Sequence, residues 1–142
     1  MKTTDEALDW AISHEIQSKN LYEHWAGIAR DIDAHKLFTN LAMMETHHIE
    51  VLTAAKERGF DQKRIDWVDL SKGVAGYPTT GLSGLKQILE YAIKKEVAAE
   101  RRYRDMAKKL PEISKAFTEL AEEERSHQVL LRDQYKRILT PH

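Results

Sequence analysis

Residues 38–48 read FTNLAMMETHH, and residues 117–127, about eighty residues further along, read FTELAEEERSH. When Phe38 is aligned with Phe117, the two stretches share Phe, Thr, Leu, Ala, Glu and His. Both contain the pattern Glu-x-x-His, as Glu45 with His48 and Glu124 with His127. Residues three apart lie on one face of a helix, so each pair would direct a carboxylate and an imidazole towards one site.

The repeat extends to a second helical stretch that precedes each copy. Residues 8–15, LDWAISHE, align with residues 89–96, LEYAIKKE, so Glu15 and Glu96 occupy equivalent positions. A tyrosine follows seven residues after each of these glutamates, as Tyr22 and Tyr103. Duplication of a helical hairpin is the simplest explanation.

Apolar residues recur at helical spacing in four long stretches, and strand-like alternation is nearly absent. The first stretch covers about 5–29 and the second about 31–59; the third starts around Ser83 and includes Ala107, and the fourth starts at Pro111. Thr3 and Glu6 have capping-box spacing at the start of the first stretch, and Asp31 or Asp33 is expected to cap the second stretch. The predicted fold class is all-α.

One connection is much longer than the others. Residues 59–81 are rich in glycine, and a break of this length is unusual inside a compact domain. If the two hairpins are related by a two-fold axis, the second and third helices run parallel. The connection must then cross the bundle, which is about 38 Å long for a ~25-residue helix, and ~22 extended residues reach about 70 Å. We expect Trp67, Val68 and Leu70 to pack this crossover against the helices. Residues 1–142 would then form a single four-helix-bundle domain.

Composition excludes several classes of protein. The 142 residues carry a net charge of −1 without a basic tract, so we expect no nucleic-acid partner. No apolar run approaches the ~20 residues that span a bilayer, and the polar start lacks a secretory signal. Cysteine is absent, which excludes disulfides, thiolate-bound metals and cysteine nucleophiles. A cytoplasmic location is the default expectation.

Four glutamates fall in the apolar stripes of their helices. A buried, unpaired carboxylate costs several kcal/mol or becomes protonated, and converging carboxylates raise one another's pKa. Two divalent cations resolve this conflict, because a charge of about +4 balances four carboxylates, and neutral histidines complete the ligand set. Oxygen and nitrogen ligands without sulfur suit iron or manganese, with zinc as an alternative. The predicted ligands are Glu15, Glu45, His48, Glu96, Glu124 and His127.

Neighbouring residues offer alternatives to this set. A single Glu-x-x-His is usually a surface feature, whereas two in equivalent repeats are much more specific. Glu123 is placed to reach His127 one turn later, but the repeat favours Glu124, and the rest of the 122–124 run is expected on the surface. His47 is rotated by ~100° from His48 and is expected at the edge of the site or on the surface rather than as a ligand.

Other polar residues are left with two interpretations. Glu100 follows Glu96 by one turn and is an alternate ligand, a residue that supports a ligand, or a solvated residue. Its repeat counterpart is Lys19, which favours the solvated residue. Tyr22 and Tyr103 are expected in the core near the metals, where a hydrogen-bonding or redox role is open. The histidines without a repeat partner are expected to be ordinary exposed or half-buried residues: His14, His24, His35 and His142.

The order Glu, Glu-x-x-His, Glu, Glu-x-x-His resembles that of the ferritin-like di-iron carboxylate superfamily, and most closely the rubrerythrin family. The resemblance covers nearly the whole chain and implies a ferritin-like four-helix bundle with two iron ions. It also implies that Glu45 and Glu124 are bridging or chelating carboxylates. Two features differ. Rubrerythrins carry an additional glutamate where this chain has Ile93, and they carry a cysteine-ligated rubredoxin domain, which these residues lack.

The resemblance implies an oxidoreductase active in oxidative stress. Hydrogen peroxide or dioxygen would oxidise the di-ferrous centre, and a separate electron-donor protein would reduce it again. Ile93 argues against rubrerythrin-type redox switching. A homodimer is expected. The alternatives are a ferroxidase in iron storage or detoxification, and a non-catalytic metal-binding bundle.

Overall fold

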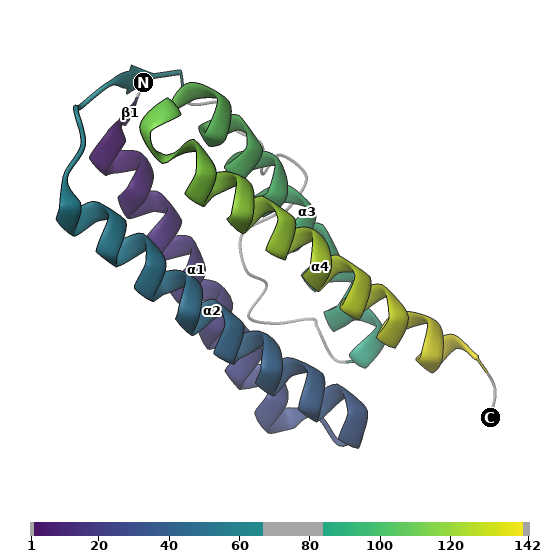
Figure 1. The fold of residues 1–142 in the computed structure, drawn as a ribbon. Coiled ribbons are helices and arrows are strands. Elements are labelled where there is room, and N and C mark those ends of the chain that lie inside the picture. The colour runs from purple at the N-terminus through teal and green to yellow at the C-terminus, as the bar shows by residue number, and fades with distance from the viewer. Residues whose placement is uncertain (1, 67–83, 141–142) are drawn as a thin grey trace.

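The computed structural model describes residues 2–66 and 84–140, which form four long helices (Figure 1). These are α1 (Thr4–Ile28), α2 (Ile32–Arg58), α3 (Leu85–Lys109) and α4 (Ser114–Leu139), the last preceded by a 3-10 turn at Pro111–Ile113. Helix α1 packs along α2 and α3 along α4, as two antiparallel hairpins, and α2 and α3 run in the same direction (Figure 1). The predicted all-α four-helix bundle is confirmed. None of the described helices is long and apolar enough to span a membrane.

The helix ends follow the local sequence signals. Thr3 Oγ1 accepts a hydrogen bond from the Glu6 backbone N–H at 3.2 Å, and Glu6 Oε1 accepts one from the Thr3 N–H at 3.0 Å. This is the predicted capping box. Of the two candidates for the second cap, Asp31 is the N-cap, and Asp33 lies inside the first turn. Helix α2 ends at Arg58 and is followed by Gly59, whose φ of 76° is strained for any residue with a side chain.

Two short strands, which the sequence did not predict, tie the start of the crossover to the start of α1. β1 (Lys2–Thr3) pairs antiparallel with β2 (Arg64–Ile65). The Thr4 hydroxyl donates to the Asp61 carbonyl and accepts from the Lys63 N–H, both at 3.1 Å. The connection therefore begins by crossing the end of the bundle. The remainder of the predicted crossover, including Trp67, Val68 and Leu70, lies outside the described residues.

Two apolar clusters occupy opposite halves of the bundle. One contains Tyr22 and Phe38, and the other contains Tyr103 and Phe117, all at most 1% exposed. The two phenylalanines that align the repeats thus occupy equivalent places in opposite clusters. Because each cluster excludes water from its half of the bundle, polar groups between them are enclosed on both sides.

Candidate metal centre

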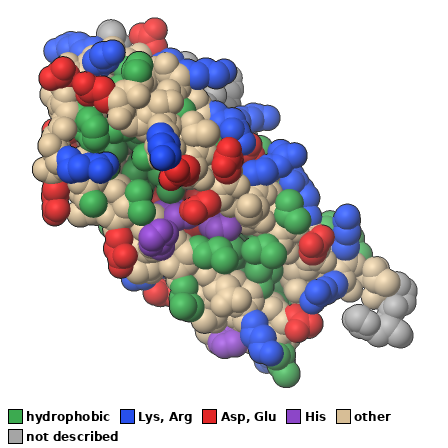
Figure 2. Space-filling view, viewed as in Figure 1, with side chains coloured by type: hydrophobic (Ala, Val, Ile, Leu, Met, Phe, Trp, Pro, Cys, Tyr) green, Lys and Arg blue, Asp and Glu red, His purple; other side chains and the backbone are tan. Residues whose placement is uncertain are grey.

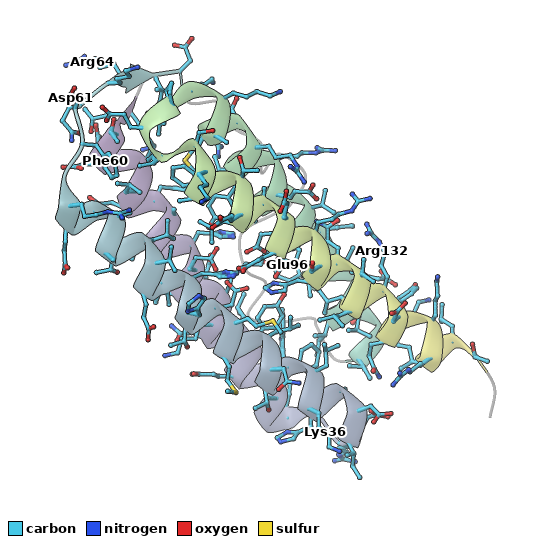
Figure 3. All side chains as sticks on the ribbon, in the orientation of Figure 1. Lys36, Phe60, Asp61, Arg64, Glu96 and Arg132 are labelled. Carbon is cyan, nitrogen blue, oxygen red and sulfur yellow. The ribbon has the colours of Figure 1, made fainter. Side chains whose placement is uncertain are left out.

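The six predicted ligands converge midway along the bundle, between the two apolar clusters. Figure 3 labels one of them, Glu96, which lies in the interior between the ends marked by Arg64 and Lys36. Each hairpin supplies one helix with a lone glutamate and one with Glu-x-x-His. All six side chains are at most 2% exposed: Glu15, Glu45, His48, Glu96, Glu124 and His127.

These residues form two overlapping sets of four. In each set, the ligand atoms lie within 4.8 Å of one another. One set is Glu15, Glu45, His48 and Glu124, and the other is Glu45, Glu96, Glu124 and His127. Glu45 and Glu124 belong to both sets, so each of these carboxylates has the position needed to bridge two ions. This sharing agrees with the role that the family resemblance implies for them.

Both histidines direct the same ring nitrogen into the cluster. Nδ1 of His48 lies 3.4 Å from Glu15 Oε2, and Nδ1 of His127 lies 3.5 Å from Glu96 Oε2. The two rings stack, with centroids 5.6 Å apart. Nδ1 is therefore the atom available to a metal ion in each half of the site.

Several of these buried atoms lack a hydrogen-bond partner among the described residues. They are Glu45 Oε1 and Oε2, Glu96 Oε2, Glu124 Oε1 and His127 Nδ1. Buried polar atoms in folded proteins are almost always satisfied, and an unsatisfied one costs about 1–3 kcal/mol or more if charged. Divalent cations would satisfy all of them at once, and a set of oxygen and nitrogen donors suits iron, manganese or zinc. The residues present therefore fit a pair of metal ions.

The charges in the cluster shift one another's pKa values. Burial alone would raise the pKa of Glu45, but His127 and His48 more than reverse this effect and bring it to about 2. Burial alone would lower the pKa of His127, but Glu45 and Glu96 raise it to about 9. We expected the carboxylates to raise one another's pKa. For Glu45 the opposite holds, because the imidazoles of His127 and His48 lie beside its carboxylate and favour its ionised form.

A tyrosine from the other hairpin anchors each lone glutamate. The Tyr22 hydroxyl donates to Glu96, and the Tyr103 hydroxyl donates to Glu15. Burial, together with the nearby carboxylates, raises the pKa of both tyrosines well above 10. Of the roles left open for these tyrosines, the structure contains the hydrogen-bonding one, which also links α1 to α3.

Sequence reasoning missed the contacts of two side chains beside the cluster. Glu123, which the sequence places within reach of His127, is half exposed, and its carboxylate instead accepts a hydrogen bond from Nε2 of His48. Lys95 is 5% exposed and donates to the Ser18 hydroxyl. Neither residue has an identical repeat partner, so the comparison of the two copies could not single them out.

The remaining candidates lie outside the cluster. Glu100 accepts hydrogen bonds from Gln128 Nε2 and Arg104 Nε, both at 2.8 Å, so it is held at the edge of the bundle rather than as a ligand. His47 is exposed, as expected, and His14 is half-buried and stacks on Trp10. His24 and His35 are exposed, and His142 lies outside the described residues.

A cavity of about 430 Å³ between α2 and α4 reaches the cluster from one face of the molecule. His48 and His127 line it, and its other walls include Met43, Met44 and Leu130. In Figure 2, histidine side chains gather in the middle of this face, beside acidic and apolar side chains. A small molecule can therefore approach the histidine side of the site from solvent.

The fold and site define a four-helix bundle with a buried carboxylate–histidine cluster suited to two ions. Residues 87–140, which include most of α3 and all of α4, match the family model of rubrerythrin. A solved structure of a hypothetical protein from Pyrococcus furiosus has the same fold, with a TM-score of 0.74 and 21% identity over 95% of this chain and 89% of that chain. No curated protein matches the chain significantly. The predicted resemblance to rubrerythrins is thus confirmed for residues 87–140, and together with the buried cluster it indicates a metal site.

Proposed function

We propose that the chain binds two iron ions and reduces hydrogen peroxide or dioxygen with electrons from a separate donor protein. The observation that carries this proposal is the pair of ligand sets that share Glu45 and Glu124. Paired metal ions typically lie ~3.5–4 Å apart, a separation that bridging carboxylates maintain. Bound iron would supply the electrons and orient the oxidant.

The chain's own residues provide the surroundings that such a reaction needs. Tyr22 and Tyr103 hold Glu96 and Glu15 in place, and each keeps a proton on its hydroxyl next to a ligand carboxylate. Reduction of hydrogen peroxide to two water molecules consumes two electrons and two protons. The cavity between α2 and α4 offers the oxidant a path to the cluster.

The electrons must come from outside these residues. The 142 residues contain no cysteine and therefore no cysteine-ligated iron that could relay electrons. A separate donor protein, and assembly of the chain as a homodimer, belong to the same proposal.

Rapid mixing tests the oxidant. The protein is loaded anaerobically with two equivalents of Fe²⁺ and mixed with hydrogen peroxide or with dioxygen, while absorbance follows oxidation to the ferric state. We expect faster oxidation by peroxide and repeated turnover only with an electron donor. His127→Ala should abolish the reaction and retain helical circular dichroism, because the imidazole contributes to binding more than to packing. Glu122→Gln, on the exposed face of α4, is the control and should react like the wild type.

A ferroxidase is the second candidate, and one observation favours it. Ile93, half-buried against the apolar cluster around Phe38, replaces the carboxylate that could follow iron as its oxidation state changes. Faster oxidation by dioxygen, or accumulation of a ferric mineral, would make the ferroxidase the better assignment. Stable iron binding without reaction with either oxidant would indicate a non-catalytic metal-binding bundle.

A further inference from the structure

The two halves of the metal centre differ in the partner of the outer histidine nitrogen. Nε2 of His48, on α2, donates to the carboxylate of Glu123, which reaches across from α4. In the alignment of Phe38 with Phe117, the residue equivalent to Glu123 is Met44. Met44 and Glu123 line the same cavity as both histidines. A thioether is only a weak hydrogen-bond acceptor. Met44 therefore cannot provide its half of the site with the strong acceptor for the outer histidine nitrogen that Glu123 provides in the other half.

A carboxylate behind a ligating histidine changes how that histidine binds metal. By accepting the Nε2 proton it holds the imidazole in the tautomer whose Nδ1 lone pair is free, and it makes that nitrogen a stronger donor. Nδ1 is the atom that His48 directs at Glu15 in the cluster. Loss of such an outer partner typically weakens metal affinity by about 10–100-fold.

Most other features of the two halves are matched. Each lone glutamate accepts a hydrogen bond from one tyrosine, and Glu45 and Glu124 are common to both sets. The second unmatched feature is Lys95, buried next to Glu96 in the chain, whose repeat counterpart is the half-buried His14. The Lys95 amine interacts electrostatically with Glu96 and with the shared Glu45, but not with Glu15. Its positive charge disfavours an added cation next to Glu96 and so weakens the site opposite the one that Glu123 strengthens.

We infer that Glu123 is a positioning residue that makes the site of Glu15 and His48 the tighter of the two, so that the metal ions bind in a fixed order. The inference rests on the proposed metal pair but not on the proposed reaction. It assigns the first ion to the half of the bundle that contains Tyr103 and the second to the half that contains Tyr22.

Anaerobic titration of the metal-free full chain with Co²⁺ tests this order, because calorimetry measures each affinity and visible absorption reports the ligand geometry. The wild type should bind two ions in two resolved steps. Glu123→Gln retains the size of the side chain but removes its charge, so the first step should weaken by about 10–100-fold and the second should change little. Glu122→Gln removes the same charge from the exposed neighbouring position and should leave both steps unchanged.

A gain-of-function variant provides the complementary test. Met44→Glu places a carboxylate beside His127 and should strengthen the second step, bringing the two steps together and changing the absorption of the second ion. Equal affinities in the wild type, or identical titrations of Glu123→Gln and Glu122→Gln, would overturn the inference and leave the proposed reaction standing. Ordered binding without peroxide turnover would instead contradict the proposed reaction and support the inference. Failure to bind Co²⁺ at all would overturn both.

Discussion

At the scale of single residues, the cluster is controlled by protons as much as by metal ions. His127 has a pKa of about 9 because Glu45 and Glu96 outweigh the effect of burial, and the pKa of His48 is raised in the same way. Without metal, the imidazole of His127 is thus mainly protonated at neutral pH, and it partly neutralises the carboxylates. A metal ligand must be unprotonated, so an incoming ion has to displace this proton.

Metal binding should therefore release protons and strengthen with pH. Between pH 6 and 9, the affinity of the His127 site should rise by up to about tenfold per pH unit, since one proton is displaced and each unit corresponds to about 1.4 kcal/mol. Calorimetry of Co²⁺ binding in buffers of different ionisation enthalpy measures the number of protons released. In His127→Gln the release should fall by about one proton at pH 7. Affinity that does not change with pH in the wild type would contradict the assigned pKa of His127.

At the scale of the elements, two local interactions hold the start of helix α1: its N-cap and the pairing of β1 with β2. Thr3 caps the helix and also lies in β1, which pairs with β2 at the beginning of the crossover. The lone glutamate of α1, Glu15, lies three turns further on. A secure start therefore sets the register of the helix that carries one half of the site.

Removal of this cap should destabilise the protein by a measurable amount. Thr3→Ala should lower the free energy of unfolding by about 1 kcal/mol, within the usual range of 0.5–2 kcal/mol, because the backbone N–H of Glu6 loses its acceptor. Urea denaturation with circular dichroism measures the change. Thr39→Ala is the matched control: its exposed hydroxyl donates to the carbonyl of His35, one turn back in α2, so the loss should be much smaller. Equal losses in the two variants would contradict a stabilising role for the cap.

At the scale of the whole molecule, the metal ions would join the two hairpins. Helices α2 and α4 make few direct contacts with each other, and Glu45 and Glu124 meet where these helices face one another. Ions shared by these two carboxylates bind only the folded bundle, so they stabilise it by mass action.

Metal addition should consequently raise the melting temperature of the wild type. At a free metal concentration of 100 times the dissociation constant, the gain is about 2.7 kcal/mol per site, or roughly 10 °C for a domain of this size. Glu45→Ala or Glu124→Ala should remove most of this rise, because each removes a ligand from both sets. Differential scanning calorimetry with and without chelator measures it, with Glu122→Ala as the exposed control. The same metal-dependent rise in all of these proteins would show that the ions bind elsewhere.

The sequence by itself predicted the four helices, the capping box of the first, two candidate caps for the second and the convergence of the six candidate ligands. Helical periodicity is local, so it places Glu45 and His48 on one face of α2 without any knowledge of the rest of the chain. The internal repeat then supplied long-range information, because equivalent positions in two copies of a hairpin meet around a common axis. This explains why Glu15 and Glu96 could be paired although they are far apart in the chain.

Only the tertiary structure decided how the helices contact one another across the bundle. The hydrogen bond from His48 to Glu123, the burial of Lys95 and the β1–β2 pairing each depend on distances between elements that periodicity does not encode. The pKa of Glu45 was misjudged for the same reason. Like charges can be counted in a sequence, but the imidazoles that outweigh them act only at the 3–4 Å separations that packing creates.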